Sequence, residues 1–541
     1  MFYKYNLNKL IVMFSVLINI VSCGGGGNND STTNNNKPGQ PQNVSATAGD
    51  GTVTVKWQKS NTGNTPTYYK VDKSIDDKKT FNDVDLNVPA DKLTLIDPDA
   101  KNGSSHIYRV IAGNNIGISA AAFSNAVTPQ AVTQRTLKLS SLLTSPTASK
   151  KNRFTSLFGK AIAFSPDGSL MAIAEKMGDP ARIFEAVVQL FGKTNTGWKN
   201  NGLIGTGLRP VIDAFGTSIA FSPDGSMLAI GEFNMARDSS TDMGSIQLFT
   251  LSNTGSWSLK QALTAKIFER GKKFGVAFSF SPDGATLAVS EFSLEPTGST
   301  YTGKIYLYTK PNTQWELSQT LSSQDSSVDY YFGISIAFSP DSTTLAVGET
   351  RGQLSNAGSV QLFSKSGTNW KYTQSLASVT PVTSSQFGIS IAFSADNNTI
   401  AVGETKTVAE QSAGSVQLFT KIGNTWNRGQ ILSAGQSTIE PAFGMSLVFS
   451  PVSNSLVVGA VPNKDKLNYG GKVYLFNYLD SSWVQSQILT SQTSLPDDQF
   501  GASVVFNSDG SSLAVGETRG NIDGNTGNAG VVNIFDKTQF P

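Results

Sequence analysis

The most regular feature of the chain is a block of alternating large and small residues that recurs seven times. Each block opens with a Phe-Gly pair. In Phe332–Phe338, for example, one face carries Phe and Ile while the other carries Gly, Ser and Ala. Alternation with a period of two predicts a β-strand, and a bulky face laid on a small one lets neighbouring sheets stack without voids. The seven pairs begin at Phe158, Phe215, Phe274, Phe332, Phe387, Phe443 and Phe500.

Each repeat is 55 to 59 residues long, and its apolar segments divide it into four strands. In the fourth repeat, a short turn at 339–342 separates the first strand from Leu345–Gly348, and a loop then leads to Gly358–Phe363. The fourth segment, Trp370–Leu376, carries Trp, Tyr, Gln and Leu at alternating positions. Units of this length predict four-stranded sheets, as in β-propellers. The tryptophan of the fourth strand stands at Trp198, Trp257, Trp315, Trp370, Trp426 and Trp483.

The seventh repeat has no tryptophan segment, and a spare strand precedes the first repeat. No fourth segment follows the third strand at Gly530–Lys537, whereas Leu137–Thr144 fits the fourth-strand pattern with Leu137 at the tryptophan position. Pairing these two strands would remove two open sheet edges. We therefore predict an all-β fold in which residues 133–541 form a seven-bladed β-propeller of four-stranded blades, closed by the N-terminal strand.

Residues 41–130 contain short alternating segments at a different spacing, separated by Gly, Asn and Asp turns. Segments such as Thr52–Trp57 predict a β-sandwich. Together with Tyr108–Ser119, they resemble a fibronectin type III domain. The resemblance implies that Trp57 lies in the core and that the tyrosine of the later segment lies at the tyrosine corner. We interpret His106, the single histidine of the chain, as an ordinary strand residue.

The N-terminus has the pattern of an export signal. Two lysines precede the apolar run Leu10–Val21, which is too short to span a bilayer as a helix. Ile20–Cys23 resembles the lipobox of bacterial lipoproteins, and the glycine that follows it resembles the outer-membrane sorting pattern. We therefore predict a lipoprotein signal peptide over 1–22, lipidation of Cys23 with palmitate-type chains, and a flexible polar linker over 23–40. Cys23 is the only cysteine of the chain.

Together, the elements of the repeat resemble the bacterial FG-GAP repeat, which is related to the propeller of the integrin α-subunit. These elements are the Phe-Gly start, the Val-Gly-Glu end of the second strand, the Gly-x-Val-x-Leu-Phe third strand and the Trp-x-x-x-Gln-x-Leu fourth strand. The Gly-Ala-Pro element of that family is retained only as Gly459–Pro462. The resemblance implies ligand binding on the rim formed by the loops between the second and third strands and the loops before Phe-Gly.

Calcium sites of the integrin type are not predicted. Such blades bind calcium through an Asp-x-Asp-x-Asp-Gly loop, because a hard cation needs several converging oxygens. Here a four-residue turn with one carboxylate, such as Ser165–Gly168, takes the place of that loop, so its Asp and Gly are interpreted as turn formers. Asn521–Asn525 lacks the closing acid and is interpreted as a surface loop. We predict no metal and no cofactor.

Composition argues against two further classes of function. With 42 Lys and Arg against 40 Asp and Glu, the chain lacks the basic excess of a nucleic-acid-binding protein. The seven repeats contain no histidine, which excludes Ser-His-Asp catalysis and histidine-ligated zinc there. A carboxylate pair for glycan hydrolysis stays possible, although the sialidase-type box is absent. We therefore expect a protein that is not an enzyme.

Six repeats end their second strand with a glutamate, which makes a candidate acidic ring on one rim. Unpaired acids there would attract cations or a basic partner. However, Arg351, Lys406 and Arg519 follow two residues after a glutamate and lie on the same side of the strand. Local ion pairs or loop-capping hydrogen bonds are therefore the favoured interpretation. The six acids are Glu175, Glu232, Glu291, Glu349, Glu404 and Glu517, with Ala460 in the remaining repeat.

The loops between the second and third strands differ most from repeat to repeat, whereas the strands are alike. Loops held by a rigid scaffold commonly carry recognition. The leading hypothesis is a lipid-anchored envelope protein that acts as a binding or adhesion module through one rim of the propeller, with a protein or a glycan as its ligand. A periplasmic scaffold in envelope assembly and a glycan hydrolase are the second and third hypotheses.

Overall fold

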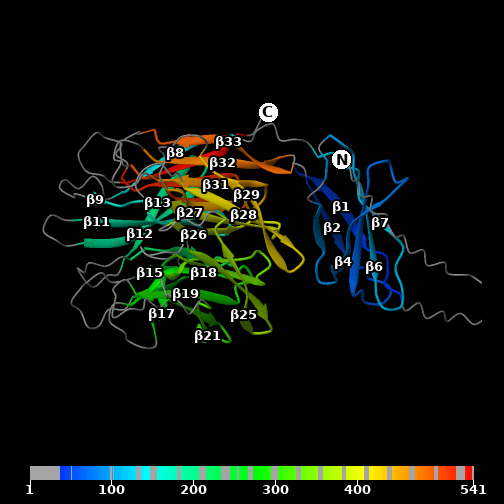
Figure 1. Ribbon diagram of the computed structural model, residues 1–541, viewed down its shortest axis with the longest axis horizontal. Coiled ribbons are helices and arrows are strands. Elements are labelled where there is room, and N and C mark those ends of the chain that lie inside the picture. The colour runs from blue at the N-terminus through cyan, green and yellow to red at the C-terminus, as the bar shows by residue number, and fades with distance from the viewer. Residues whose placement is uncertain are drawn as a thin grey trace, which may run out of the picture. The chain divides into compact units, whose positions relative to one another are not determined.

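The computed structural model describes two compact units, one built chiefly from residues before Thr128 and the other chiefly from Thr128–Pro541. Within the described ranges every regular element is a strand, and no helix is long and apolar enough to cross a membrane (Figure 1). The described residues are 37–49, 52–97, 100–101, 103–129, 136–146, 155–178, 184–205, 215–232, 244–252, 255–265, 272–293, 303–324, 331–350, 358–379, 385–406, 414–434, 442–461, 470–479, 481–492, 498–519 and 530–538.

The first unit consists of two small sheets, with strand orders β1-β2-β5 and β4-β3-β6-β7. Trp57 on β2 is buried and meets Tyr69 on β3 edge-on, with ring centroids 5.3 Å apart, so an aromatic contact joins the two sheets. His106 is buried, and its backbone N–H donates to the Val127 carbonyl at 2.7 Å. The strands are β1 Gln42–Ala48, β2 Val53–Gln58, β3 Tyr68–Ser74, β4 Asn82–Pro89, β5 Thr94–Asp97, β6 Ile107–Gly113 and β7 Ala122–Phe123.

The second unit is a series of antiparallel four-stranded sheets, one for each Phe-Gly repeat, in a propeller-like arrangement. In six of these sheets the strands follow chain order. The first sheet contains β10 Ile162–Phe164, β11 Leu170–Gly178, β12 Phe184–Thr194 and β13 Gly197–Gly205, and the short strand β9 Thr155–Ser156 also pairs with β11. The second contains β14 Ile219–Phe221, β15 Met227–Glu232, β16 Ser245–Leu251 and β17 Trp257–Leu263. The third contains β18 Lys272–Phe280, β19 Thr286–Ser293, β20 Lys304–Thr309 and β21 Glu316–Ser322.

The next three sheets have the same order, and the seventh sheet takes one strand from far earlier in the chain. The fourth sheet contains β22 Phe332–Phe338, β23 Thr344–Glu349, β24 Ser359–Ser366 and β25 Asn369–Ala377. The fifth contains β26 Ser385–Phe393, β27 Thr399–Lys406, β28 Ser415–Ile422 and β29 Thr425–Leu432. The sixth contains β30 Phe443–Phe449, β31 Ser455–Ala460, β32 Lys472–Leu479 and β33 Ser482–Thr490. The seventh contains β34 Phe500–Phe506, β35 Ser512–Glu517, β36 Val531–Lys537 and β8 Leu137–Thr144.

Strand β8 is the fourth strand of the last sheet, as the spare segment before the first repeat predicted. It pairs antiparallel with β36, from Leu137 opposite Lys537 to Thr144 opposite Val531. The last sheet also meets the first sheet, because β34 contacts β10 and Ser503 Oγ donates to the Gly159 carbonyl at 2.7 Å.

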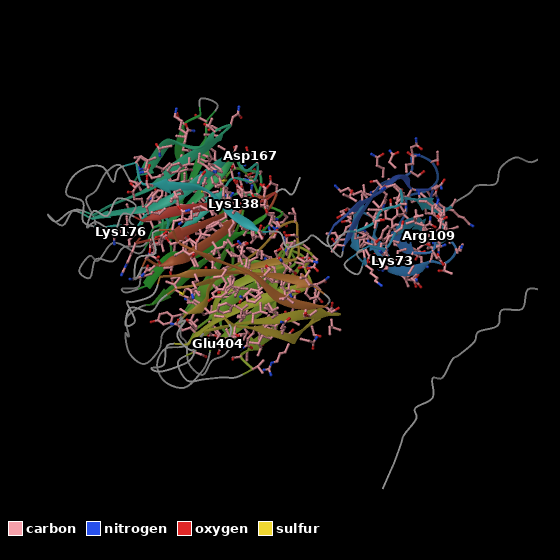
Figure 2. All side chains as sticks on the ribbon, turned by 90° about the horizontal axis from the view of Figure 1, so that it is seen from above. Lys73, Arg109, Lys138, Asp167, Lys176 and Glu404 are labelled. Carbon is pink, nitrogen blue, oxygen red and sulfur yellow. The ribbon has the colours of Figure 1, made fainter. Side chains whose placement is uncertain are left out.

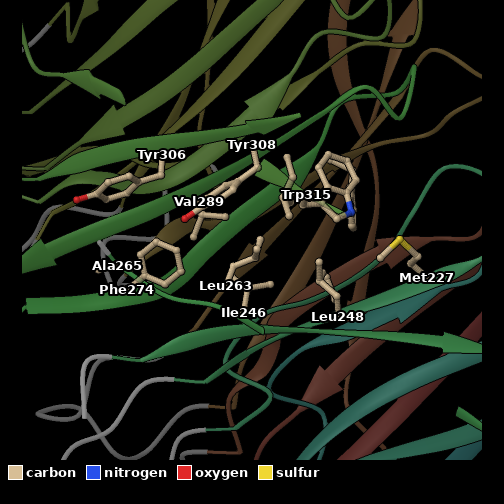
Figure 3. Close-up of a cluster of buried hydrophobic side chains, with 13 residues drawn as sticks. Met227, Ile246, Leu248, Leu263, Ala265, Phe274, Val289, Tyr306, Tyr308 and Trp315 are labelled. Carbon is tan, nitrogen blue, oxygen red and sulfur yellow. The ribbon is translucent and has the colours of Figure 1, made fainter. Parts of the chain in front are cut away.

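The core of this unit lies between successive sheets. Figure 3 shows one such cluster, to which the second sheet contributes Met227 and Leu248 and the third sheet contributes Phe274 and Trp315. These side chains are at least nine-tenths buried. Packing of this kind occurs at each junction, so the sheets stabilise one another across their faces rather than through one central core.

Glycine is required where adjacent sheets approach most closely. Gly388, of the fifth Phe-Gly pair, has φ +91°, and its carbonyl accepts a hydrogen bond from Ser335 of the preceding sheet at 2.7 Å. A Cβ on Gly348, in the Val-Gly-Glu segment, would lie 2.1 Å from that same carbonyl oxygen. The two sequence signatures of the repeat therefore mark the two sides of one backbone contact.

In five of the sheets, a glutamine on the fourth strand clamps the backbone of the residue at the tryptophan position of the next sheet. Gln374 Nε2 donates to the Trp426 carbonyl at 2.7 Å, and the Trp426 N–H donates back to Gln374 Oε1 at 2.9 Å. Gln487 makes the same pair of bonds with Leu137, each at 2.8 Å. The full set of clamps is Gln261 with Trp315, Gln319 with Trp370, Gln374 with Trp426, Gln430 with Trp483, and Gln487 with Leu137.

Candidate binding rim

The second and third strands of most sheets end at the same level, and the variable loops leave from there. In the fifth sheet, for example, the pairing of β27 with β28 ends where Glu404 lies opposite Ser415. The first sheet extends its ladder further, to Gly178 opposite Phe184. We call this end of the unit the loop rim. In the other six sheets, the facing residues of the second and third strands at this rim are Glu232 and Ser245, Glu291 and Lys304, Glu349 and Ser359, Glu404 and Ser415, Ala460 and Lys472, and Glu517 and Val531.

The glutamates of the candidate acidic ring are buried rather than displayed to solvent. The exposed fraction is 0% for Glu349, Glu404 and Glu517. It is 1% for Glu175 and 2% for Glu291, and only Glu232 is half-buried. The physical reason is that each second strand is covered on both faces by neighbouring sheets. The six acids therefore do not form an exposed acidic surface, and we do not assign them to cation attraction.

Each of these carboxylates accepts a hydrogen bond from a polar side chain on the third strand. Gln417 Nε2 donates to Glu404 Oε2 at 2.8 Å (Glu404 is labelled in Figure 2). In the third sheet the donor is the Tyr306 hydroxyl, at 3.2 Å from Glu291 Oε1. The other donors are Gln189 to Glu175, Gln247 to Glu232, Gln361 to Glu349 and Asn533 to Glu517.

Serines at the start of the loops before Phe-Gly bind the same carboxylates. Ser378, just after β25, donates to Glu404 Oε2 at 3.1 Å and accepts from Gln417 Nε2 at 2.9 Å. Ser491 donates to Glu517 at 2.9 Å, and Ser145 donates to Glu175. Since each serine follows the fourth strand of the preceding sheet, one glutamate fixes the bases of two loops from adjacent sheets.

The sixth sheet, which has Ala460 instead of glutamate, uses a carboxylate from elsewhere. Asp498, two residues before Phe500, is fully buried. Its Oδ1 accepts from the Gly471 N–H at 2.8 Å and from the Phe500 N–H at 3.0 Å. A buried carboxylate therefore lies at the base of this loop as well, although it comes from the opposite side of the junction.

The third-strand glutamines and the loop serines are the residues that the sequence interpretation did not assign. The signal for the glutamines was a polar residue repeated inside the apolar Gly-Ser-Val-Gln-Leu-Phe segment, because a buried polar side chain needs a partner. Of the basic residues expected beside the glutamates, Arg351 and the side chain of Lys406 lie outside the described residues. Arg519 is half-buried, and its N–H donates to the Asp498 carbonyl at 3.1 Å.

Several sequence expectations concern residues outside the described part of the chain. They include Cys23, the signal peptide over 1–22 and almost all of the linker, together with the candidate calcium loop Asn521–Asn525. The variable loops at 179–183, 233–243, 294–302, 351–357 and 462–469 also lie outside it.

The opposite end of the unit, the turn rim, carries the Ser-Pro-Asp-Gly turns and the hairpins between third and fourth strands. Asp167, labelled in Figure 2, accepts from Ser165 Oγ at 2.5 Å and from the Ser169 N–H at 3.1 Å. The Ser165 hydrogen bond, with help from Ser169, holds the pKa of Asp167 below its usual value. The same short turn-closing bonds recur at Asp224, Asp283, Asp341 and Asp396. Among the described residues, no group of three or more His, Cys, Asp or Glu side chains could hold a metal ion.

The lowered pKa values of the turn aspartates lead us to expect that the free energy of unfolding falls in acid. Because the pKa of Asp167, Asp224 and Asp509 is lower in the folded state, each contributes stability above its unfolded pKa of about 3.9. That stability is lost as pH falls through the folded pKa. We expect about 0.5 kcal/mol per aspartate after allowance for solvent screening.

The measurement is urea unfolding between pH 5 and pH 2. Replacing the three aspartates by asparagine keeps a turn-forming residue and should flatten the fall in unfolding free energy. An unchanged pH profile in this triple variant would show that these turns do not cause the acid sensitivity.

Comparison with known proteins finds no family model that matches the chain and no curated protein that matches it. Among solved structures, a putative 6-phosphogluconolactonase from Bacteroides uniformis ATCC 8492 is 11% identical with a TM-score of 0.42, covering 61% of this chain and 84% of its own. Sqt1 from Chaetomium thermophilum is 16% identical, also with a TM-score of 0.42, covering 74% and 90%. Similarity at this level carries no argument about function.

Proposed function

We propose that the chain is a lipid-anchored binding or adhesion protein of the bacterial cell envelope, held in the outer membrane through Cys23. Its ligand, a protein or a glycan, binds at the loop rim of a seven-bladed propeller of FG-GAP type, and the protein is not an enzyme. The N-terminal unit serves as a fibronectin type III spacer between the anchor and the propeller.

Four contacts support a closed propeller. The strand β8 completes the last sheet, and β34 of that sheet contacts β10 of the first. Ser145, which follows β8, donates to Glu175 in the first sheet. Leu137 takes the tryptophan place in the clamp with Gln487. The bonds of Ser145 to Glu175 and of Ser503 to the Gly159 carbonyl repeat, between the last and first sheets, bonds found at other junctions. The Leu137 clamp ties β8 to the sixth sheet, so the edge of β36 is covered.

The observation that carries the binding function is the network at the loop bases. Buried carboxylates such as Glu404 fix two loops at once, through Ser378 on one and Ser415 on the other. Loops that differ in sequence therefore start from bases of the same geometry. A rigid frame that presents diverse loops side by side is the arrangement that recognition commonly uses.

The test uses the full-length protein with an array of surface glycans and extracellular-matrix proteins. Replacing residues 234–242 and 351–357 with Gly-Ser segments of the same length should lower binding at least 10-fold. Stability should be nearly unchanged, because loop tips bury little area. In cells, Cys23→Ala should abolish acyl labelling and release the protein from the membrane fraction, because no other cysteine is present.

A matched control is a Gly-Ser replacement of Asn312–Gln314, in a hairpin at the turn rim, which should leave binding intact. If the hairpin variant loses binding and the loop variants do not, the loop rim is the wrong surface. Retention of Cys23→Ala in the membrane, with no acyl label on the wild type, would rule out the anchor.

A further inference from the structure

At the turn rim, a lysine from one sheet reaches the turn aspartate of the preceding sheet. Lys365 Nζ lies 3.1 Å from Asp283 Oδ2 and 5.9 Å from the ring centroid of Trp370. The ammonium group is therefore held by a carboxylate and an aromatic ring together, a combination suited to an alkylammonium ion. Lys365 stands two residues after Phe363 and opposite Trp370 in the hairpin between β24 and β25.

The arrangement recurs at two other junctions. Lys421 Nζ lies 5.7 Å from the ring centroid of Trp426. Burial is the largest single effect on the pKa of Asp341 and raises it, but hydrogen bonds from Ser339 and Thr343, together with the charge of Lys421, lower that pKa by more. Lys193 lies 6.0 Å from the ring centroid of Trp198. It contributes in the same way at Asp509, where the hydrogen bond from Ser511 is the largest cause.

The junction between the fifth and sixth sheets keeps the aspartate and the tryptophan but not the lysine. Tyr478, two residues after Phe476 and opposite Trp483, stands at the lysine position. Asp396 accepts from Ser394 Oγ at 2.5 Å and from the Asn398 N–H at 3.1 Å. Within the described part of the chain, no lysine or arginine lies at ion-pair distance from Asp396.

A second change opens the same junction. In the third, fourth and sixth sheets, a hydroxyl residue before the clamping glutamine donates to a third-strand carbonyl, as Thr373 does to Leu362 at 3.1 Å. In the fifth sheet this position is Gly429, which has no side chain to fill the space. Gln430, the next residue, is exposed, whereas the glutamines of the four other clamps are half-buried.

These substitutions leave a cavity of about 340 Å³. Leu418, Phe449 and Trp483 form its apolar part, and these three side chains are at least nine-tenths buried. Tyr478 also lines the cavity; it is 41% exposed, and its ring centroid is 5.4 Å from that of Trp483. Asp396 also lines the cavity. The volume lies within the range of small-molecule sites, and the walls combine apolar surface with one charged group.

We propose that this cavity binds an alkylammonium group, with the ammonium at Asp396 and its methylene chain against Tyr478 and Trp483. The ligand thus takes the place that Lys365 and Lys421 occupy at other junctions. The group is either the side chain of a lysine in a partner protein or a free diamine. The Tyr478 ring adds the apolar surface that an extended methylene chain needs, and the Asp396 charge selects against neutral ligands of the same shape.

The test uses the full chain with 1,5-diaminopentane as the probe, titrated by calorimetry or NMR at low salt. We expect saturable binding with a Kd of about 1 mM or tighter, within reach for a ligand of this size. N-Pentylacetamide, which has the same chain without the charge, should not bind. Raising the salt concentration should weaken binding, because the site is open to solvent.

Three variants should remove the site. Asp396→Asn should weaken binding at least 10-fold, Tyr478→Lys should block the cavity with an internal ammonium, and Gly429→Ser should narrow it. Asp224→Asn is the control, since it removes a turn aspartate at another junction and should leave the Kd unchanged. Melting curves of all variants separate loss of the site from loss of the fold.

The outcomes distinguish the sources of the ligand. A lysine-containing extended peptide that binds at least 10-fold more tightly than the diamine identifies a partner protein, and equal or weaker binding identifies a free amine. No saturable binding by either probe overturns the proposal. It is also overturned if Tyr478→Lys binds the diamine as the wild type does, or if only neutral sugars bind at the cavity.

Discussion

Replacing Gly348 by alanine is expected to lower the unfolding free energy of the second unit by about 3 kcal/mol or more. The new Cβ would lie 2.1 Å from the Gly388 carbonyl oxygen and 2.3 Å from Ser335 Oγ. The carbonyl belongs to the backbone of the next sheet, so relief of the clash requires the two sheets to move apart. The gain of up to about 1 kcal/mol from a less flexible unfolded chain is too small to offset this.

Thermal and urea unfolding measure this effect, with an expected fall in melting temperature of about 3 °C or more for a unit of this size. The first sheet offers a matched control, because Ala174 already stands at the equivalent position and the Cβ of Ala174 is 3.0 Å from where a Cβ on Gly216 would be. Ala174→Gly should therefore lower stability by only about 0.5–1 kcal/mol, the usual effect of a glycine inside a strand. Equal stability of Gly348→Ala and wild type would show that the sheets are not held at this distance.

The second large effect is expected from removing β8 as a strand. Replacing residues 137–144 by a Gly-Ser segment of the same length should cost at least about 5 kcal/mol, since two buried leucines and a full strand ladder are lost. Leu137 and Leu143 are 4% and 6% exposed. Their loss also uncovers the outer edge of β36 and the partners of Leu137 at Gln487.

Hydrogen exchange and thermal unfolding of the full chain measure the loss. Amide protection should fall first in Val531–Lys537, which donates to β8, and in the sheets on either side. Replacing only the exposed Lys138 and Thr144 by serine is the control and should change stability by less than about 0.5 kcal/mol. If the Gly-Ser variant melts with the wild type, β8 does not complete the last sheet in solution.

The division of each repeat into strands could be predicted from sequence because every strand repeats the same pattern. Phe332–Phe338 was predicted from its alternation and Leu345–Gly348 from its place after the turn in each repeat, and the two segments lie in β22 and β23. The first repeat departs from the fourth-strand pattern, because it has Gly202 where the next five repeats have glutamine. Its neighbour Trp257 has no glutamine clamp and is half-buried, whereas Trp315 is 4% exposed.

The role of the glutamates could not be predicted from one strand. Whether Glu404 faces solvent or a neighbour depends on Ser378, which lies in the preceding sheet and 26 residues earlier in the chain. Only the stacking of sheets brings the two together. Departures from the repeat were visible at Gly429 and Tyr478, but their common location at one cavity follows from the register of hairpins in two adjacent sheets.

The pairing of β8 with β36 also constrains the order of events in folding. Ser140 and Ile534, which are hydrogen-bonded, are separated by 394 residues. During synthesis β8 is the first strand of the second unit to be made. Its apolar face stays uncovered until nearly the whole unit has been synthesised. Contacts of such long range form slowly. Until β36 is made, β8 can pair with the wrong strand, including β36 of another molecule. We therefore expect domain-swapped dimers among the misfolded products.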